Sequence, residues 1–224
     1  MPSKISFNII ATGSTGNAVE IQNRILIDCG VPFKHISRIA HELQIVLLTH
    51  IHGDHFNYST IRRLAEERPA LRWGCGAWLA QPLLECGVQP QNIDVMTYRR
   101  KYAYKNFSVE PVPLNHNVPN FGYKLFLPEG RVFYATDTND LNGISAPDFD
   151  LYLVECNYED EEIQERISDK KMRGEYIYEK DVLNNHLSKA KCDDWIYKNI
   201  GPCGEYVYLH GHVERGAAGE RPAD

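Results

Sequence analysis

The heptapeptide at residues 49–55, Thr-His-Ile-His-Gly-Asp-His, constrains this chain more than any other stretch. It directly follows the apolar, β-branched run at 45–48, which predicts a buried strand that ends in a histidine-rich loop. In an extended segment His50 and His52 point the same way, and Gly53 permits a tight turn before the second Asp-His pair. Imidazole nitrogens and carboxylate oxygens are zinc ligands. The spacing therefore predicts a metal site rather than a polar loop with incidental histidines.

Four other segments end an apolar, strand-like run with a single Asp or His. These end residues are Asp28, His116, Asp137 and His210. One of them alone would be an ordinary polar strand boundary. Together with the 49–55 cluster, however, they resemble the metallo-β-lactamase superfamily, whose motifs appear here in family order over residues 5–212. The resemblance implies an α/β fold, the metallo-β-lactamase αβ/βα sandwich, in which two mixed β-sheets are flanked by helices.

The same resemblance implies two divalent metal ions, Zn²⁺ or alternatively Mn²⁺. It assigns the first metal to His50, His52 and His116, the second to Asp54, His55 and His210, and a bridging position to Asp137. A hydroxide bound by both ions would then be the nucleophile at neutral pH, oriented by Asp54. Asp28 is expected to hydrogen-bond the histidine loop instead of binding metal. His212 is the alternative to His210, which is preferred because it directly follows the apolar strand.

Within the superfamily, three segments resemble the branch of WalJ/YycJ-type exonucleases and tRNA 3′-processing endonucleases. They are the turn at 13–17, the strand and loop at 150–158, and Asn-His-Leu-Ser at 185–188. By this resemblance His186 would be a general acid that protonates the leaving oxygen; the alternative is that it only ends a helix. Tyr158 stands where the exonuclease-like proteins have His. The Gly/Pro-rich insert that some tRNA nucleases use to bind tRNA is absent.

Composition agrees with one catalytic domain, predicted at 1–213, followed by a disordered tail at 214–224. The 224 residues carry a formal charge of −6 and are 43% hydrophobic, which does not indicate a large nucleic-acid-binding face. Six cysteines without a C-x-x-C pair, and no signal peptide or apolar membrane-length stretch, predict a cytoplasmic protein. Asp137 also argues against a secreted antibiotic-degrading enzyme, because the common secreted lactamases of this fold have Cys there. A homodimer is compatible with the sequence.

The apolar patterns also predict the secondary structure. Strands are expected near 4–10, 18–22, 24–28, 45–49, 70–74, 93–97, 107–112, 121–127, 131–136, 150–155 and 205–209, and helices near 33–42, 59–67, 77–86, 159–170, 176–185 and 188–199. Ser59 is predicted to cap the second of these helices.

The favoured function is a phosphodiesterase that acts on a nucleic acid or on a cyclic or small nucleotide. Two alternatives stay open at the level of sequence. One is an acyl hydrolase that cleaves a thioester or lactone, and the other is a non-catalytic, zinc-stabilised binding module. The complete ligand set argues against the last. Basic clusters at 62–63, 99–101 and 170–173 support phosphate binding only weakly, since charge runs are usually solvated faces.

Overall fold

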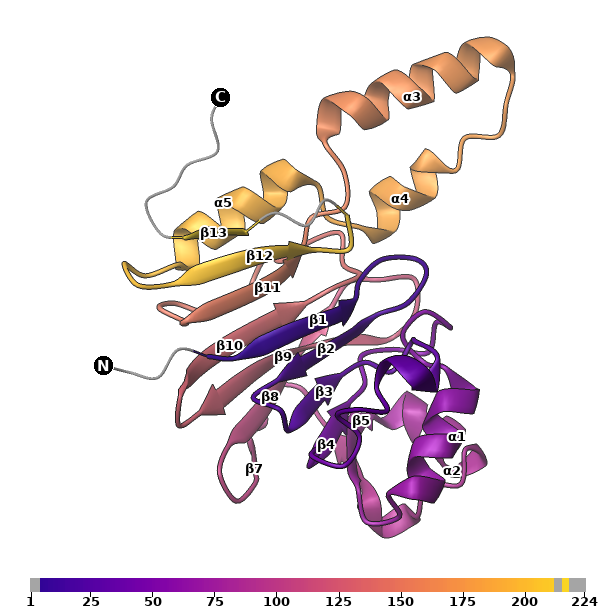
Figure 1. The fold of residues 1–224 in the computed structure, drawn as a ribbon. Helices are drawn as coiled ribbons and strands as arrows, with labels where there is room; N and C mark the ends of the chain where they lie inside the picture. Colours follow the sequence, from indigo (N-terminus) through magenta and orange to yellow (C-terminus); the bar gives the residue numbers. More distant parts are fainter. Residues whose placement is uncertain (1–4, 212–214, 218–224) are drawn as a thin grey trace.

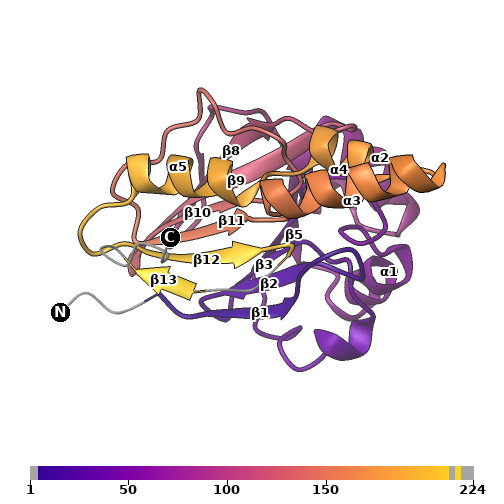
Figure 2. The ribbon, with the colours of Figure 1, turned by 90° about the horizontal axis from the view of Figure 1, so that it is seen from above.

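Two mixed β-sheets lie face to face in this protein, and helices cover their outer faces (Figures 1 and 2). The computed structural model describes residues 5–211 and 215–217. The first sheet has the order β1-β2-β3-β4-β5-β6, with bounds Phe7–Ala11, Ala18–Ile21, Ile25–Ile27, Ile45–Leu47, Arg72–Gly76 and Ile93–Met96. The second has the order β13-β12-β11-β10-β9-β8-β7; from β7 to β13 the bounds are Tyr102–Ala103, Ser108–Leu114, Asn120–Leu127, Gly130–Ala135, Leu151–Glu155, Glu205–Leu209 and Arg215–Ala217.

Both sheets combine antiparallel and parallel pairs. In the first sheet β1, β2 and β3 are antiparallel neighbours, whereas β3 to β6 are parallel. In the second, β7 to β10 are antiparallel, and β10, β11 and β12 are parallel. The helices are α1 (Tyr58–Glu67), α2 (Ala80–Glu85), α3 (Asp160–Arg173), α4 (Glu179–Asn185) and α5 (Lys189–Asn199). This architecture confirms the predicted αβ/βα sandwich.

The main core lies between the two sheets and follows from the alternation of side chains along each strand. In β3 and β4, Ile25, Ile27, Ile45 and Leu47 point to the other sheet, where they share one apolar cluster with residues of β8 to β12. The residue between each pair points the opposite way, as Leu26 does. Strands buried on both faces must be apolar throughout, which is why 45–48 is a continuous apolar run.

Each outer face packs against its own helices. On the first sheet, Ile61 and Leu64 of α1 and Leu83 of α2 share a buried cluster with strand residues. On the second sheet, Trp195 and Ile196 of α5 do the same. Helices α3 and α4 instead project from the body as an arm, clearly visible in Figure 1. Only Ile163 of α3 is buried.

Two predicted elements differ in the structure. Residues 33–42 form a 3₁₀ helix at Phe33–His35 followed by turns, not a regular α-helix. There Ile39 N–H donates to the Ile36 carbonyl, and such i to i+3 bonds rarely extend over more than a few residues. The predicted cap of α1 is also wrong: the helix begins one residue earlier than expected, so Asn57 caps it by accepting from Thr60 N–H at 3.1 Å. Ser59 lies inside the helix and donates to Asn57.

Within the segment predicted to be a tail, Arg215–Ala217 forms β13 on β12, whereas 214 and 218–224 lie outside the described residues. Further 3₁₀ helices occur at Ala77–Leu79 and Pro90–Asn92. In the described part of the chain, no helix is both long and apolar enough to span a bilayer.

Candidate metal centre

The ends of several strands meet at one edge of the sandwich, and His116 follows one of them, β8. Parallel strands present their carboxyl ends on the same side, so the residues that follow β3 and β4 come together with those at the ends of β10, β11 and β12. Three of these end residues have left-handed backbone, with φ of 61° at Asp28, 55° at Asp137 and 65° at His210. Such a conformation costs a non-glycine residue free energy and is typical of functional sites.

Three histidines form the first cluster. Nε2 of His50 lies 3.1 Å from Nδ1 of His52, and Nε2 of His116 lies 3.3 Å from that same Nδ1. One ligand nitrogen from each lies within 4.8 Å of the other two. Burial and, to a lesser extent, the positive charge of His55 lower the pKa of His50 to about 2. Its imidazole is therefore neutral and able to coordinate a cation.

Asp54, His55 and His210 form the second cluster. The Asp54 carboxylate lies 3.6 Å from Nε2 of His55 and 3.9 Å from Nε2 of His210. Asp137 stands between the clusters, with Oδ2 3.5 Å from Nε2 of His50 and 2.5 Å from Nε2 of His55. The structure thus brings together all seven residues that the sequence singled out as ligands. His212, the alternative to His210, lies outside the described residues.

The charge and bonding of this cluster fit divalent cations. Burial alone would lower the pKa of His55, but Asp28 and Asp137 raise it to about 10, which shows how strongly the site attracts positive charge. Among the described residues none gives the buried Nε2 of His210 a hydrogen bond. A buried nitrogen that has no hydrogen bond but lies near a carboxylate is the arrangement expected of a ligand for a metal ion.

Asp28 holds the histidine loop from behind. Its fully buried carboxylate lies 2.7 Å from Nδ1 of His55 and accepts from the N–H and the hydroxyl of Thr49, both at 2.9 Å. The Thr49 hydroxyl in turn lies 2.9 Å from Nδ1 of His50. Partners of this kind fix the orientation of a ligating imidazole.

The turn at 13–17 packs against the same loop. The Asn17 side-chain amide donates to the carbonyl oxygens of Gly13 and Asp54 and lies 2.9 Å from Nε2 of His55. Gly30 makes the close approach possible, because a Cβ there would lie 1.7 Å from the Asp54 carbonyl oxygen. The role of Asn17 was not predicted, although the turn itself was. Asn17 supports the histidine loop.

A carboxylate that the sequence analysis did not assign completes the site. Glu155, the last residue of β11, is fully buried and accepts from Thr138 N–H at 2.9 Å. Its Oε1 lies 2.5 Å from Nδ1 of His186 and 3.1 Å from Nδ1 of His210. Burial would lower the pKa of His186, but hydrogen bonds to Asp137 and Glu155 raise it to about 9. His186 also directly follows α4, so it both ends a helix and faces the centre.

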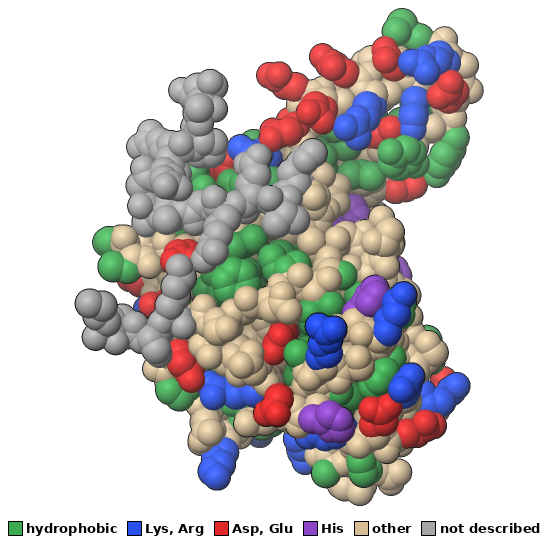
Figure 3. Space-filling model, in the orientation of Figure 1, with side chains coloured by type: hydrophobic (Ala, Val, Ile, Leu, Met, Phe, Trp, Pro, Cys, Tyr) green, Lys and Arg blue, Asp and Glu red, His purple; other side chains and the backbone are tan. Residues whose placement is uncertain are grey.

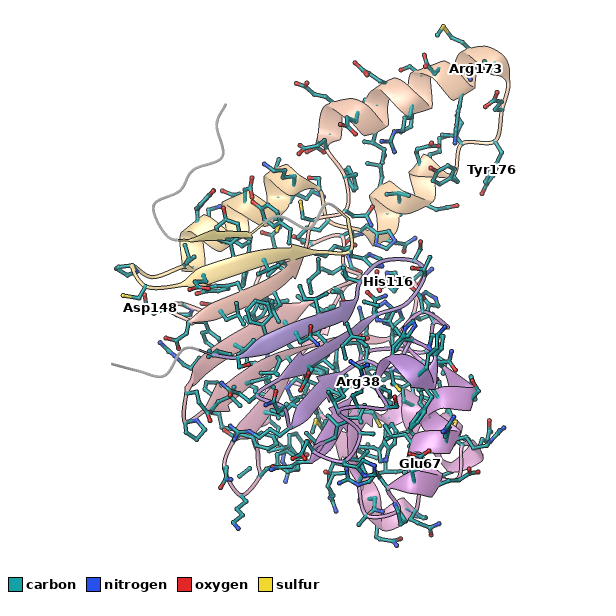
Figure 4. All side chains as sticks on the ribbon, in the orientation of Figure 1. Arg38, Glu67, His116, Asp148, Arg173 and Tyr176 are labelled. Atoms are coloured by element: carbon teal, nitrogen blue, oxygen red, sulfur yellow. The ribbon has the colours of Figure 1, made fainter. Side chains whose placement is uncertain are left out.

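The metal centre opens into a cavity of about 230 Å³. Ligand residues form its floor, and His186 and one face of α4 form a wall. Figure 3 shows histidine side chains exposed where the arm meets the body, and Figure 4 places His116 there, at the edge of the sheets below α4. A substrate can therefore reach the centre from solvent.

A sequence model of the beta-lactamase superfamily domain matches residues 23–181. The chain belongs to the beta-lactamase superfamily. This match covers the histidine loop, the lone His and the aspartate between the two clusters, and it confirms the resemblance seen in the sequence. The superfamily fold and the His/Asp cluster are those of a metal-dependent hydrolase. No curated protein matches the chain.

Solved structures show the same fold at low identity. The metallo-beta-lactamase fold protein YhfI from Bacillus subtilis is 16% identical, with a TM-score of 0.69 over 93% of this chain and 87% of that one. Human tRNase Z, short form, is 14% identical, with a TM-score of 0.68 over 92% of each chain. Zn²⁺-bound PqqB from Methylobacterium extorquens is 11% identical, with a TM-score of 0.56 over 71% of this chain and 74% of that one.

Proposed function

We propose that this superfamily member is a phosphodiesterase that acts on nucleic acid or on a cyclic nucleotide with two divalent ions, Zn²⁺ first and Mn²⁺ as the alternative. The first ion would be held by His50, His52 and His116, the second by Asp54, His55 and His210, and Asp137 would contact both. The observation that carries the proposal is the position of Asp137 between two ligand clusters at the floor of an open cavity.

Bound divalent ions would lower the pKa of water and neutralise charge that develops on a phosphoryl group. The chain's own residues would do the rest. Asp54 is partly exposed at the cavity floor, where its carboxylate can accept a hydrogen bond from the attacking water and orient it. Against the effect of burial, Asp137 and Glu155 raise the pKa of His186 to about 9 in the metal-free protein, and the acid form that they favour can donate its proton to the leaving oxygen. Glu155 orients the His186 ring and stabilises its charge.

The His186–Glu155 pair favours phosphodiesters over the thioester form of the acyl alternative. A nucleoside alkoxide is a poor leaving group and gains much from a proton donor, whereas a thiolate leaves without one. The human tRNase Z fold similarity supports a nucleic-acid substrate, and the −6 formal charge supports a small nucleotide. The six cysteines form no disulfide in the described structure, and five of them are buried, which supports a reducing, cytoplasmic setting.

A substrate panel tests this proposal. Protein reconstituted with Zn²⁺ or Mn²⁺ is assayed on bis-nitrophenyl phosphate, dinucleotides, cyclic nucleotides, single-stranded DNA and a thioester. We expect turnover of phosphodiesters and about two metal ions per chain by elemental analysis. Asp54→Ala, which removes a ligand and the water's acceptor, serves as the inactive control. Turnover of the thioester alone would favour the acyl hydrolase, and metal binding without any turnover would favour the binding module.

A further inference from the structure

One face of α4 looks into the cavity in front of the metal centre. Tyr178, Asp181, Val182 and Asn185 line the cavity together with His186 and the floor residues. Their spacing of three, one and three residues places them on a single helical face. A substrate that is held at the metal centre and fills the cavity contacts this face of the arm.

Asp181 restricts what that substrate can be. A carboxylate only accepts hydrogen bonds, and the Tyr176 hydroxyl already donates to its Oδ2 at 3.2 Å. No lysine or arginine in the described part of the chain forms a salt bridge with it. A carboxylate without a cationic partner repels phosphate oxygens, so a substrate group that contacts it is an O–H or N–H donor away from the phosphate. In a nucleotide, the ribose hydroxyls are the donors nearest to the phosphate.

Tyr178 supplies a flat surface at the same wall. Its side chain is 49% exposed, and Nζ of Lys170 lies 3.8 Å from the centre of its ring. Lys170 is also 2.7 Å from the buried carboxylate of Glu179, which ties α3 to the first turn of α4. These contacts hold the ring in place, and a fixed aromatic ring in a cavity is a stacking platform for a nucleobase.

We propose that this face binds the ribonucleoside of the substrate, with the base on Tyr178 and the ribose 2′-hydroxyl donating to Asp181. The inference rests on the proposed phosphodiesterase function and narrows it to ribonucleotide diesters. The diester can belong to RNA or to a 3′,5′-cyclic ribonucleotide, since both have a free 2′-hydroxyl. DNA lacks this donor.

Uridine substrates test the proposal, because uracil has no exocyclic amine that could donate to Asp181 in place of the ribose hydroxyl. The dinucleotides UpU and dUpdU are compared, as are 3′,5′-cyclic UMP and its 2′-deoxy form, each with the metal-loaded protein. We expect kcat/KM to be roughly 10- to 100-fold higher for the ribose member of the pair that is the true substrate, the range for a hydrogen bond to a charged group. Asp181→Ala should bring that ratio close to one, and Asp181→Asn, which keeps an acceptor oxygen but no charge, should leave an intermediate ratio.

Two further variants complete the design. Asp169→Ala removes an exposed carboxylate on the same arm, outside the cavity and paired with Arg173, and should leave the ratio unchanged. Tyr178→Ala should raise KM for ribose and deoxyribose substrates alike, whereas Tyr178→Phe, which keeps the ring, should leave KM at the wild-type value.

Two results would overturn the inference while leaving the phosphodiesterase proposal intact. One is a ribose-to-deoxyribose ratio of kcat/KM near one in the wild type, and the other is a ratio that Asp181→Ala does not change. Absence of turnover of every diester, bis-nitrophenyl phosphate included, would instead refute the proposed function.

Discussion

At the scale of single residues, His186 is the side chain whose role is most open to measurement. If it protonates the leaving oxygen, His186→Ala should lower turnover of a dinucleotide by roughly 10²- to 10⁴-fold. Turnover of a nitrophenyl diester should fall much less, because nitrophenolate scarcely needs a proton. Elemental analysis should still find both metals. Equal losses on the two substrates would instead show that His186 serves to end α4, and loss of a metal would make it a ligand.

Glu155 leads to a second prediction at this scale, on pH dependence. The carboxylate helps to raise the pKa of His186 above its ordinary value of 6.5, so the acid form persists at higher pH. Glu155→Gln should lower that pKa, and dinucleotide turnover should then be lost at a lower pH, by roughly one unit or more. Nitrophenyl diester turnover, measured over the same pH range, is the control. An alkaline limb that does not move would exclude this coupling.

The residues of the site differ in how far sequence could identify them. The seven ligand candidates stood out because His and Asp recur at the ends of apolar strands in a fixed order, a pattern typical of side chains that converge on a metal. In the sequence, Glu155 is only a polar residue at the end of an apolar run, which is common. Its place in the site is evident from the structure, where it lies 2.5 Å from His186, 31 residues away in the chain. The left-handed backbone at Asp137 leaves no trace in sequence, since only tertiary packing imposes it.

At the scale of elements, the packing of the histidine loop against its neighbours predicts contrasting effects for substitutions at two glycines. Gly30→Ala would place a Cβ 1.7 Å from the Asp54 carbonyl oxygen, so the loop must move, whereas nothing lies within 4 Å of a Cβ at Gly53. We expect Gly30→Ala to lower stability by about 1–3 kcal/mol and to weaken metal binding. Gly53→Ala, in the histidine loop itself, should change neither. Thermal unfolding and metal titration measure both variants, and a tolerated Gly30→Ala would refute this packing.

Strands were predicted better than helices, for a physical reason. The central parallel strands β3, β4 and β11 are buried along their whole length, so continuous apolar runs mark them clearly. Residues 33–42 have apolar side chains at helical spacing, and Ile36 and Ala40 are indeed buried. A series of turns buries these side chains as well as an α-helix would, so the apolar periodicity alone could not distinguish the two backbone conformations. The two-residue strand β7 was missed because it is too short for any pattern.

At the scale of the whole molecule, the two sheets together supply one centre, so metal binding should stabilise the entire sandwich. The first sheet contributes the histidine loop, and the second contributes Asp137, Glu155 and His210. Neither half holds a complete site. A saturating ion that binds only the folded chain adds several kcal/mol, which corresponds to a rise in Tm of order 10 °C for a domain of this size.

The size of that rise should depend on pH. Without metal, the pKa values of His186, His55 and His210 are raised from 6.5 to about 9, 10 and 11, so these groups bind protons more tightly in the folded than in the unfolded chain. Their contribution to stability is complete below pH 6.5 and is lost as pH rises through the folded-state values. Metal ions compete with the protons on the two ligands among them, His55 and His210, and bind better as pH rises. The Tm of metal-free protein should therefore fall between pH 6.5 and 9, while the increase in Tm produced by Zn²⁺ becomes larger.

Thermal unfolding with and without chelator measures both trends, and His35→Ala, outside the centre, is the control that should leave them unchanged. A metal-induced increase that shrinks over this range would contradict the idea that cations replace protons at His55 and His210.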